Sequence, residues 1–157
     1  GLGVVHADLK PGNVFLCADG GVKVLDFGFS HRHDPELAGG GEEPTVVFLE
    51  RVGALTPAYA AIDLLYGRPA VPVDDVYSLG VIAYMMAAGT HPFGQRSARA
   101  AQKAGSDPVR PPGLPRARWR ALQSALAFDR ADRPASARAF VDAFLRPTLW
   151  ERIAGRG

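Results

Sequence analysis

Cysteine is almost absent from this chain of 157 residues, and neither sign of charge dominates it. Cys17 is the single cysteine, so no disulfide can form within the chain, and this usage fits a reducing compartment. Because it lies in an apolar run, we expect Cys17 to be a small core residue. The formal net charge of +2 is too small to indicate nucleic acid or a membrane surface as a partner. We therefore expect the basic stretch 115–120 to be the solvated start of a helix.

Long hydrophobic runs are missing as well. A transmembrane helix needs about 18 or more consecutive apolar residues, and the sequence contains no such stretch. The most apolar window, residues 76–88, is shorter and contains Ser78, which favours a buried helix of a soluble protein. No signal peptide is recognisable, so we expect these 157 residues to be cytoplasmic. A membrane anchor of the full-length protein would lie outside this segment. The chain starts without Met, inside a strand-like run, and we expect the natural protein to begin earlier.

The residues that are present predict a globular domain of the α+β class, mainly α. The composition, 47% apolar and 22% charged, is ordinary, and the length suffices for one domain with a core. Apolar runs at 14–17 and 22–26 flank a group of turn residues, which predicts a β-hairpin. Residues 2–5 are expected to form another short strand. Residues 28–55 have no clear period and are expected to form a long loop.

Helical periodicity and helix-ending residues mark out the rest of the chain. Asp74 or Asp75 can cap a long helix that ends before Gly89, and the prolines of 106–115 predict a loop. The tail after Pro147 is expected to be frayed. In chain order, we expect helices at 58–66, 74–88, 96–103, 116–128 (with Trp119, Leu122 and Leu126 on one face) and 136–145 (with Ala139, Phe140, Ala143 and Phe144 on one face).

Four residues suited to phosphate chemistry lie within the first thirty positions. Asp8 and Asn13 flank a turn, and Asp26 ends the second strand of the expected hairpin, which can bring it back beside Asn13. Amide and carboxylate oxygens are hard ligands that suit Mg²⁺. Lys10 suits a phosphate oxygen, and an unpaired Asp can accept a hydroxyl proton. These groups are what phosphoryl transfer requires, although Asp8 and Asn13 are also residue types that favour ordinary turns.

The sequence around these residues resembles that of the protein kinases. HADLKPGN (6–13) is similar to the catalytic loop H-R-D-L-x-x-x-N, and DFG (26–28) is similar to the metal-binding motif that follows it. Three later segments also resemble the family, and overall the chain is similar to bacterial eukaryotic-like serine/threonine protein kinases. The resemblance implies a protein-kinase-like C-lobe, with a short hairpin before a helical bundle. The later segments are LTPAYAAID (55–63, substrate-facing loop and A-P-E), DDVYSLGVIAYMMAAGTHPF (74–93, central helix) and AFDRADRPAS (127–136, Arg-Pro motif).

The resemblance also implies a role for each matching residue of the site. Asp8 would be the catalytic base, and Lys10, which is typical of the Ser/Thr class, would neutralise the transferring phosphate. Asn13 and Asp26 would hold Mg²⁺, or Mn²⁺ in its place, beside ATP. Thr56 would bond near Asp8 and Lys10 and help to define hydroxyl substrates, so the expected partner is a protein substrate with Ser or Thr.

Further residues match positions that bind the nucleotide or support the site. Phe15 would lie under the adenine ring of ATP. We expect His6 to pack and hydrogen-bond, with Phe27 in the core beside it. Asp75 is expected to cap a helix, to accept catalytic-loop backbone amides as in kinases, or to do both.

The sequence departs from the family pattern at the A-P-E segment, where Ile62 and Asp63 replace Pro and Glu. The carboxylate remains, with a reach one methylene shorter. We still expect Asp63 to form a buried structural ion pair with Arg133, and breaking such a pair from one side costs about 3–5 kcal/mol.

A second departure concerns control of the site. Ala7 replaces the catalytic-loop Arg, which in the family commonly pairs with a phosphorylated residue of the activation loop. The residues just before Thr56 contain no Ser, Thr or Tyr, and only Ser30 and Thr45 are available earlier. We therefore expect activation not to depend on phosphorylation of this loop.

The N-lobe motifs of the family have no counterpart in the 157 residues. There is no G-x-G-x-x-G loop and no strand Lys with a helix Glu, and the opening GLGVVH leads directly into the catalytic loop. We expect residues 1–146 to be a kinase C-lobe fragment and 147–157 a C-terminal tail. The fragment alone is then expected to be inactive, and its missing partner is an N-lobe in cis.

Two other functions remain open at this stage. Small-molecule phosphotransferases of the aminoglycoside-kinase type share the Asp and Asn loop and the later metal Asp, but Lys10, the intact DFG and the segments TPAY and DVYSLG argue against them. A non-catalytic, kinase-like binding module is favoured by the missing N-lobe. Retention of Asp8, Lys10, Asn13 and Asp26 argues against it.

Overall fold

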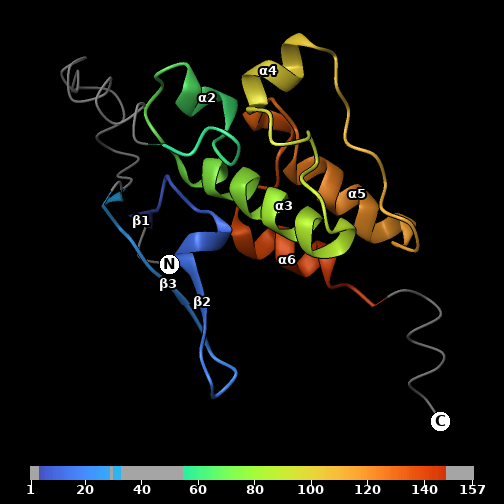
Figure 1. Cartoon of the computed structure of the whole chain (residues 1–157), viewed down its shortest axis with the longest axis horizontal. Coiled ribbons are helices and arrows are strands. Elements are labelled where there is room, and N and C mark those ends of the chain that lie inside the picture. Colours follow the sequence, from blue (N-terminus) through green and yellow to red (C-terminus); the bar gives the residue numbers. More distant parts are fainter. Residues whose placement is uncertain (1–3, 29, 33–54, 148–157) are drawn as a thin grey trace.

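In the computed structural model, residues 4–28, 30–32 and 55–147 are described, so most of the predicted loop 28–55 and the tail after Pro147 fall outside the described part. Within that part, helices are packed around one long central helix, and two short antiparallel sheets lie at one end (Figure 1). This is an α+β arrangement in which helices predominate, as the sequence predicts. None of the described helices is long and apolar enough to span a bilayer.

The strands form two separate pairs. β2 (Val14–Leu16) and β3 (Val22–Val24) make the predicted hairpin, and β1 (Val4–Val5) pairs with β4 (His31–Arg32), a strand that the sequence did not predict. The β2–β3 hairpin projects away from the helices (Figure 1). No second layer covers this ribbon among the described residues, so Cys17 is half-buried, and the prediction of a core cysteine is wrong.

The central helix is α3 (Pro72–Ala88), which contacts α5 (Arg116–Ala125), α6 (Ala137–Phe144) and β1. Its side chains Val76, Tyr77 and Val81 are fully buried. Burial of this kind contributes about 1.5–3 kcal/mol for each large apolar side chain. The helix that the sequence predicts to be buried is therefore the one on which the others pack.

The start of α3 differs from the prediction. The residue that caps the helix is Val71, not Asp74 or Asp75, because Pro72 already has a backbone geometry suited to the first helical position. Asp74 lies in the first turn, where its Oδ2 accepts a hydrogen bond of 2.9 Å from the backbone N–H of Val71. The helix ends where predicted, at Gly89, whose φ of +70° is in the left-handed region.

The helix predicted over 58–66 is much shorter, because α2 spans only Ile62–Leu65. The residues before it form turns whose carbonyl groups bind side chains in place of helix amides. The carbonyl of Ala58 accepts from the His91 ring at 2.9 Å, and that of Tyr59 accepts from the Ser78 hydroxyl at 2.8 Å. Local apolar spacing cannot reveal such long-range partners.

The remaining helices lie near their predicted positions. α4 (Ala98–Lys103) begins after Ser97, whose side chain caps it, and α5 ends three residues earlier than expected. On the last helix, α6, Phe140 is buried, but Ala139 and Ala143 are exposed, so the predicted apolar face is only partly right. A short 3₁₀ helix, η2 (Arg130–Asp132), joins α5 to α6.

Candidate active site

The backbone before Asp8 is fixed by a carboxylate of the central helix. Asp75 accepts hydrogen bonds from the backbone N–H of His6 at 2.7 Å and from that of Ala7 at 2.9 Å. Ala7 has a φ of +66°, a left-handed conformation that costs a non-glycine residue about 1–3 kcal/mol. Burial raises the pKa of Asp75, while its bonds to the two amides oppose that rise. The sequence predicts that Asp75 caps a helix or accepts the catalytic-loop amides, and the structure shows the second of these roles.

Asp8 lies at the centre of a compact polar cluster. Its Oδ2 accepts from Lys10 Nζ at 2.7 Å, and its Oδ1 accepts from the backbone N–H of Thr56 at 3.2 Å. Lys10 Nζ also donates to Thr56 Oγ1 at 2.8 Å. Asp8 is only 5% exposed. The structure thus brings together three residues separated by up to 48 positions in sequence, as the resemblance to the protein kinases implies.

His6 connects this cluster to the strand that precedes Asp26. Its Nδ1 accepts from the backbone N–H of Asp8 at 3.3 Å, which places the proton on Nε2, and Nε2 then donates to the carbonyl of Leu25 at 3.0 Å. The His6 and Phe27 rings lie 5.0 Å apart, as expected for neighbours. Phe27 is nevertheless 53% exposed, so its prediction as a core residue is wrong.

Asn13 and Asp26 are the residues that could hold a metal ion. The Asn13 amide donates through Nδ2 to the carbonyl of Asp8 at 2.9 Å, so its side-chain oxygen is directed elsewhere. The backbone N–H of Leu25 donates to the Asn13 carbonyl at 2.8 Å, which holds the strand before Asp26 against Asn13. Asp26 is exposed, and among the described residues its Oδ1 accepts one long bond of 3.4 Å, from the Gly28 amide.

This pair of oxygen ligands fits Mg²⁺, which commonly binds one or two protein side chains together with phosphate oxygens and water. No group of three or more His, Cys, Asp or Glu residues suited to a metal occurs in the described ranges. A metal site formed by Asn13 and Asp26 would therefore depend on a ligand for its remaining contacts. Phe15, the predicted adenine contact, lies on β2 and is 56% exposed.

The predicted ion pair of Asp63 and Arg133 belongs to a larger network. Asp63 lies 3.4 Å from Arg133, but Arg133 is closer to Asp74, at 3.1 Å, and Asp74 also binds Arg130 at 2.7 Å. Arg68 takes the other oxygen of Asp63 at 2.7 Å. The sequence does not predict Asp74 as a partner of Arg133. The available signal was that Asp63 is one methylene shorter than the Glu of the A-P-E motif, which indicated a second carboxylate at Arg133.

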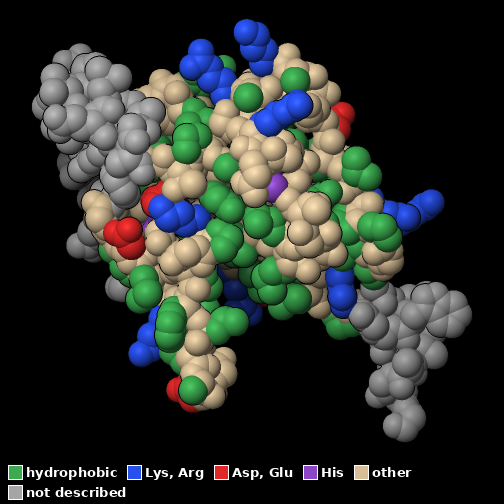
Figure 2. Space-filling view, viewed as in Figure 1, with side chains coloured by type: hydrophobic (Ala, Val, Ile, Leu, Met, Phe, Trp, Pro, Cys, Tyr) green, Lys and Arg blue, Asp and Glu red, His purple; other side chains and the backbone are tan. Residues whose placement is uncertain are grey.

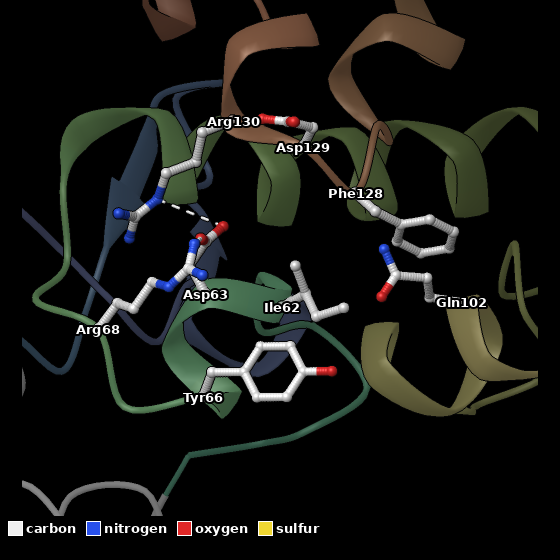
Figure 3. Close-up of a pocket in the computed structure, with 8 residues that line it drawn as sticks. All are labelled: Ile62, Asp63, Tyr66, Arg68, Gln102, Phe128, Asp129 and Arg130. Carbon is white, nitrogen blue, oxygen red and sulfur yellow. Dashed lines mark hydrogen bonds and ion pairs between the residues drawn. The ribbon is translucent and has the colours of Figure 1, made fainter.

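A pocket of about 250 Å³ lies beside this network, and Figure 3 shows Asp63 with Arg68 and Arg130 in its wall. The acidic groups of the wall are already engaged, because Asp63 pairs with arginines and Asp129 accepts from the Ala131 amide at 2.9 Å. None of the residues that line the pocket belongs to the Asp8 cluster. They are Ile62, Asp63, Tyr66, Arg68, Gln102, Phe128, Asp129 and Arg130.

The network predicts that Asp74 contributes more to stability than Asp63. Asp74→Asn keeps an acceptor for the Val71 amide but leaves the fully buried Arg133 without its closest carboxylate, so we expect a loss of about 3–5 kcal/mol in the free energy of unfolding. Asp63→Asn should also destabilise, by a smaller amount. Denaturant unfolding measures both changes.

The matched control is Asp142→Asn, which removes an ion pair whose side chains are 84% and 58% exposed. Such surface pairs contribute only about 0–1 kcal/mol. If Asp74→Asn were no more destabilising than this control, the network would not support the fold in the way described.

Comparison with known proteins places these residues in context. Residues 1–154 match the family model described as the protein kinase domain. The serine/threonine-protein kinase PkaA of Streptomyces coelicolor is 37% identical over 139 residues, which cover 85% of this chain and 24% of that protein. PknK of Mycobacterium tuberculosis is 36% identical over 143 residues, covering 87% of this chain and 12% of that kinase. The chain thus spans about a quarter or less of these curated relatives.

Proposed function

The chain belongs to the protein kinase family, among the bacterial eukaryotic-like serine/threonine kinases, and from this premise we propose that it supplies the catalytic and metal-binding residues for ATP-dependent phosphorylation of Ser and Thr in proteins. The cluster of Asp8, Lys10 and Thr56 is the observation that carries the proposal. A buried carboxylate and a hydroxyl, both bonded to one ammonium group, are the groups needed to orient a substrate hydroxyl and to receive charge from a phosphate.

In this proposal each residue of the cluster has one task. Asp8 accepts the proton of the attacking hydroxyl, and Lys10 neutralises charge on the transferring phosphoryl group. Thr56 holds both of them, through its backbone N–H and its hydroxyl, and lies where the hydroxyl substrate enters. Because Lys10 bridges Asp8 and Thr56 at 2.7 and 2.8 Å, these groups hold one another in place.

Asn13 and Asp26 complete the proposed site. They hold Mg²⁺, or Mn²⁺ in its place, and Phe15 lies under the adenine ring of ATP. When bound, the ion neutralises negative charge on the phosphates. The support for this assignment is the side-chain oxygen of Asn13, which the bond to Asp8 does not use, and the exposed carboxylate of Asp26 with its long bond to Gly28.

We further propose that residues 1–146 form the larger, C-terminal lobe of the kinase fold, followed by a tail at 147–157, and that an N-lobe in cis covers the hairpin. Large apolar side chains gather along the protruding hairpin (Figure 2), and an exposed apolar group of this size is typical of an interface. Its members are Phe15, Leu16, Val22, Val24, Leu25 and Phe27, each 38–74% exposed.

Asp8→Asn in the natural protein tests the proposed activity. Because an amide cannot accept the hydroxyl proton, we expect phosphotransfer to a protein substrate to fall by about 10²–10⁴-fold, with nucleotide binding retained. Asp142→Asn, far more exposed and outside the cluster, is the control for the substitution itself. Undiminished transfer by Asp8→Asn would contradict the assignment. Nucleotide binding without transfer in the unmodified protein would favour a non-catalytic binding module.

We also propose that activation does not require phosphorylation of the loop before Thr56. Ala7 provides no guanidinium for a phosphate, and the Ser30 hydroxyl is already bonded to the Phe27 carbonyl at 2.7 Å. Thr45, which lies outside the described residues, is the remaining candidate. We expect Thr45→Ala to transfer phosphate at a rate within about twofold of that of the unmodified protein. The reason is that Ala7 offers no guanidinium to a phosphate on Thr45, so removing the Thr45 hydroxyl breaks no such contact. Abolished activity in a folded Thr45→Ala protein would refute this proposal.

A further inference from the structure

His91 is a buried residue that no step of the proposed mechanism uses. It lies three residues after the end of α3, and it is 7% exposed. Its Nδ1 accepts hydrogen bonds from the backbone N–H groups of Phe93 and Gln95, both at 3.1 Å. An imidazole nitrogen that accepts two N–H groups carries no proton, so the proton is on Nε2. Nε2 therefore donates to the carbonyl of Ala58, at 2.9 Å.

The bond to Ala58 reaches the turn that contains Thr56. This turn is closed by a hydrogen bond of 3.0 Å from the Tyr59 amide to the Thr56 carbonyl. The Tyr59 ring lies edge-on to the His91 ring, with centroids 5.8 Å apart. One end of the turn is thus held by His91, while Thr56 at the other end contacts Asp8 and Lys10.

His6 has the same bonding pattern on the other side of the site. In both rings Nδ1 accepts the amide two residues later, and Nε2 donates to a carbonyl far away in sequence, that of Leu25 for His6 and that of Ala58 for His91. His6 thereby connects Asp8 to the strand before Asp26. By the same chemistry, His91 connects the end of α3 to the turn at Thr56.

We propose that His91 is a positioning residue, which holds the Thr56–Tyr59 turn through the Ala58 carbonyl and so sets the affinity of the site for the hydroxyl-bearing protein substrate. The substrate part of this inference rests on the proposed kinase function. Burial lowers the pKa of His91, in agreement with a neutral ring, while the bond to Ala58 opposes that change. An imidazolium could not accept the Phe93 and Gln95 amides.

Two substitutions distinguish the hydrogen bond that His91 donates to the Ala58 carbonyl from those that it accepts from the Phe93 and Gln95 amides. In His91→Asn the amide oxygen takes the place of Nδ1 and keeps the acceptor for Phe93 and Gln95, but the side chain is too short to reach Ala58. In His91→Gln the amide nitrogen takes the place of Nε2 and keeps the donor to Ala58, but the acceptor is lost. If His91 acts through Ala58, the Gln variant retains the function that the Asn variant loses.

The first readout is amide hydrogen exchange in the natural protein, which does not depend on activity. We expect the Thr56 and Tyr59 amides to exchange about tenfold faster in His91→Asn and to remain close to the unmodified protein in His91→Gln. Equal exchange in the two variants, or faster exchange only in His91→Gln, would overturn the proposal. Should His91→Asn fail to fold, NMR of the unmodified protein decides: a protected Nε2–H tautomer of His91 is expected, and an Nδ1–H tautomer would overturn the link.

The second readout is steady-state phosphorylation of a protein substrate. We expect His91→Asn to raise the KM for that substrate by about three- to tenfold, the effect of losing one hydrogen bond, with the KM for ATP unchanged. His91→Gln should restore most of the affinity. An equal rise in both KM values would indicate a general structural role and overturn the substrate part. Absence of phosphotransfer in the unmodified protein would refute the proposed function, while the exchange experiment would still decide the role of His91.

Discussion

The hydrogen bonds from the His6 and Ala7 amides to Asp75 are the interaction on which the rest of the site depends. They join the most deeply buried helix to the chain immediately before Asp8, and they hold Ala7 at a positive φ that this residue would otherwise avoid. Asp75 is half-buried, and its two amide donors oppose the rise in pKa that burial causes. The position of Asp8 is therefore set by α3, not by the exposed hairpin beside it.

Two histidines extend this control from α3 to both sides of the Asp8 cluster. His6 binds the carbonyl of Leu25 and so fixes the strand that leads to Asp26, while His91 binds the carbonyl of Ala58 and fixes the turn that leads to Thr56. Both rings use one nitrogen for a local amide and the other for a distant segment. A site assembled in this way is held by hydrogen bonds on the helix side, while the apolar side chains of the hairpin are exposed.

Much of this arrangement could be predicted from the sequence because it depends on local patterns. The hairpin, the long helix ending at Gly89 and the cluster of Asp8, Lys10 and Thr56 follow from turn residues, apolar spacing and motif similarity. These features need only the identity and spacing of a few residues, which one sequence supplies.

The errors concern choices among competing partners. The sequence predicts that Arg133 pairs with Asp63 alone, whereas the structure adds the nearer carboxylate of Asp74. It also predicts a buried Phe27, whereas that side chain is 53% exposed. The role of His91 had no local signal at all, because its partner Ala58 lies 33 positions away and is bonded through its backbone. Such contacts depend on three-dimensional packing, which local periodicity does not encode.

The most direct test of the account is the phosphotransfer rate of Asp75→Asn in the natural protein, measured together with its cooperative unfolding. An Asn side chain can accept only one of the two amides and presents an N–H₂ group to the other, so the backbone before Asp8 should shift while α3 remains folded. A displacement of this kind costs about 10²-fold in rate, and the account predicts a loss of that size in a folded protein. An unchanged rate would contradict the claim that Asp75 and α3 position the catalytic carboxylate.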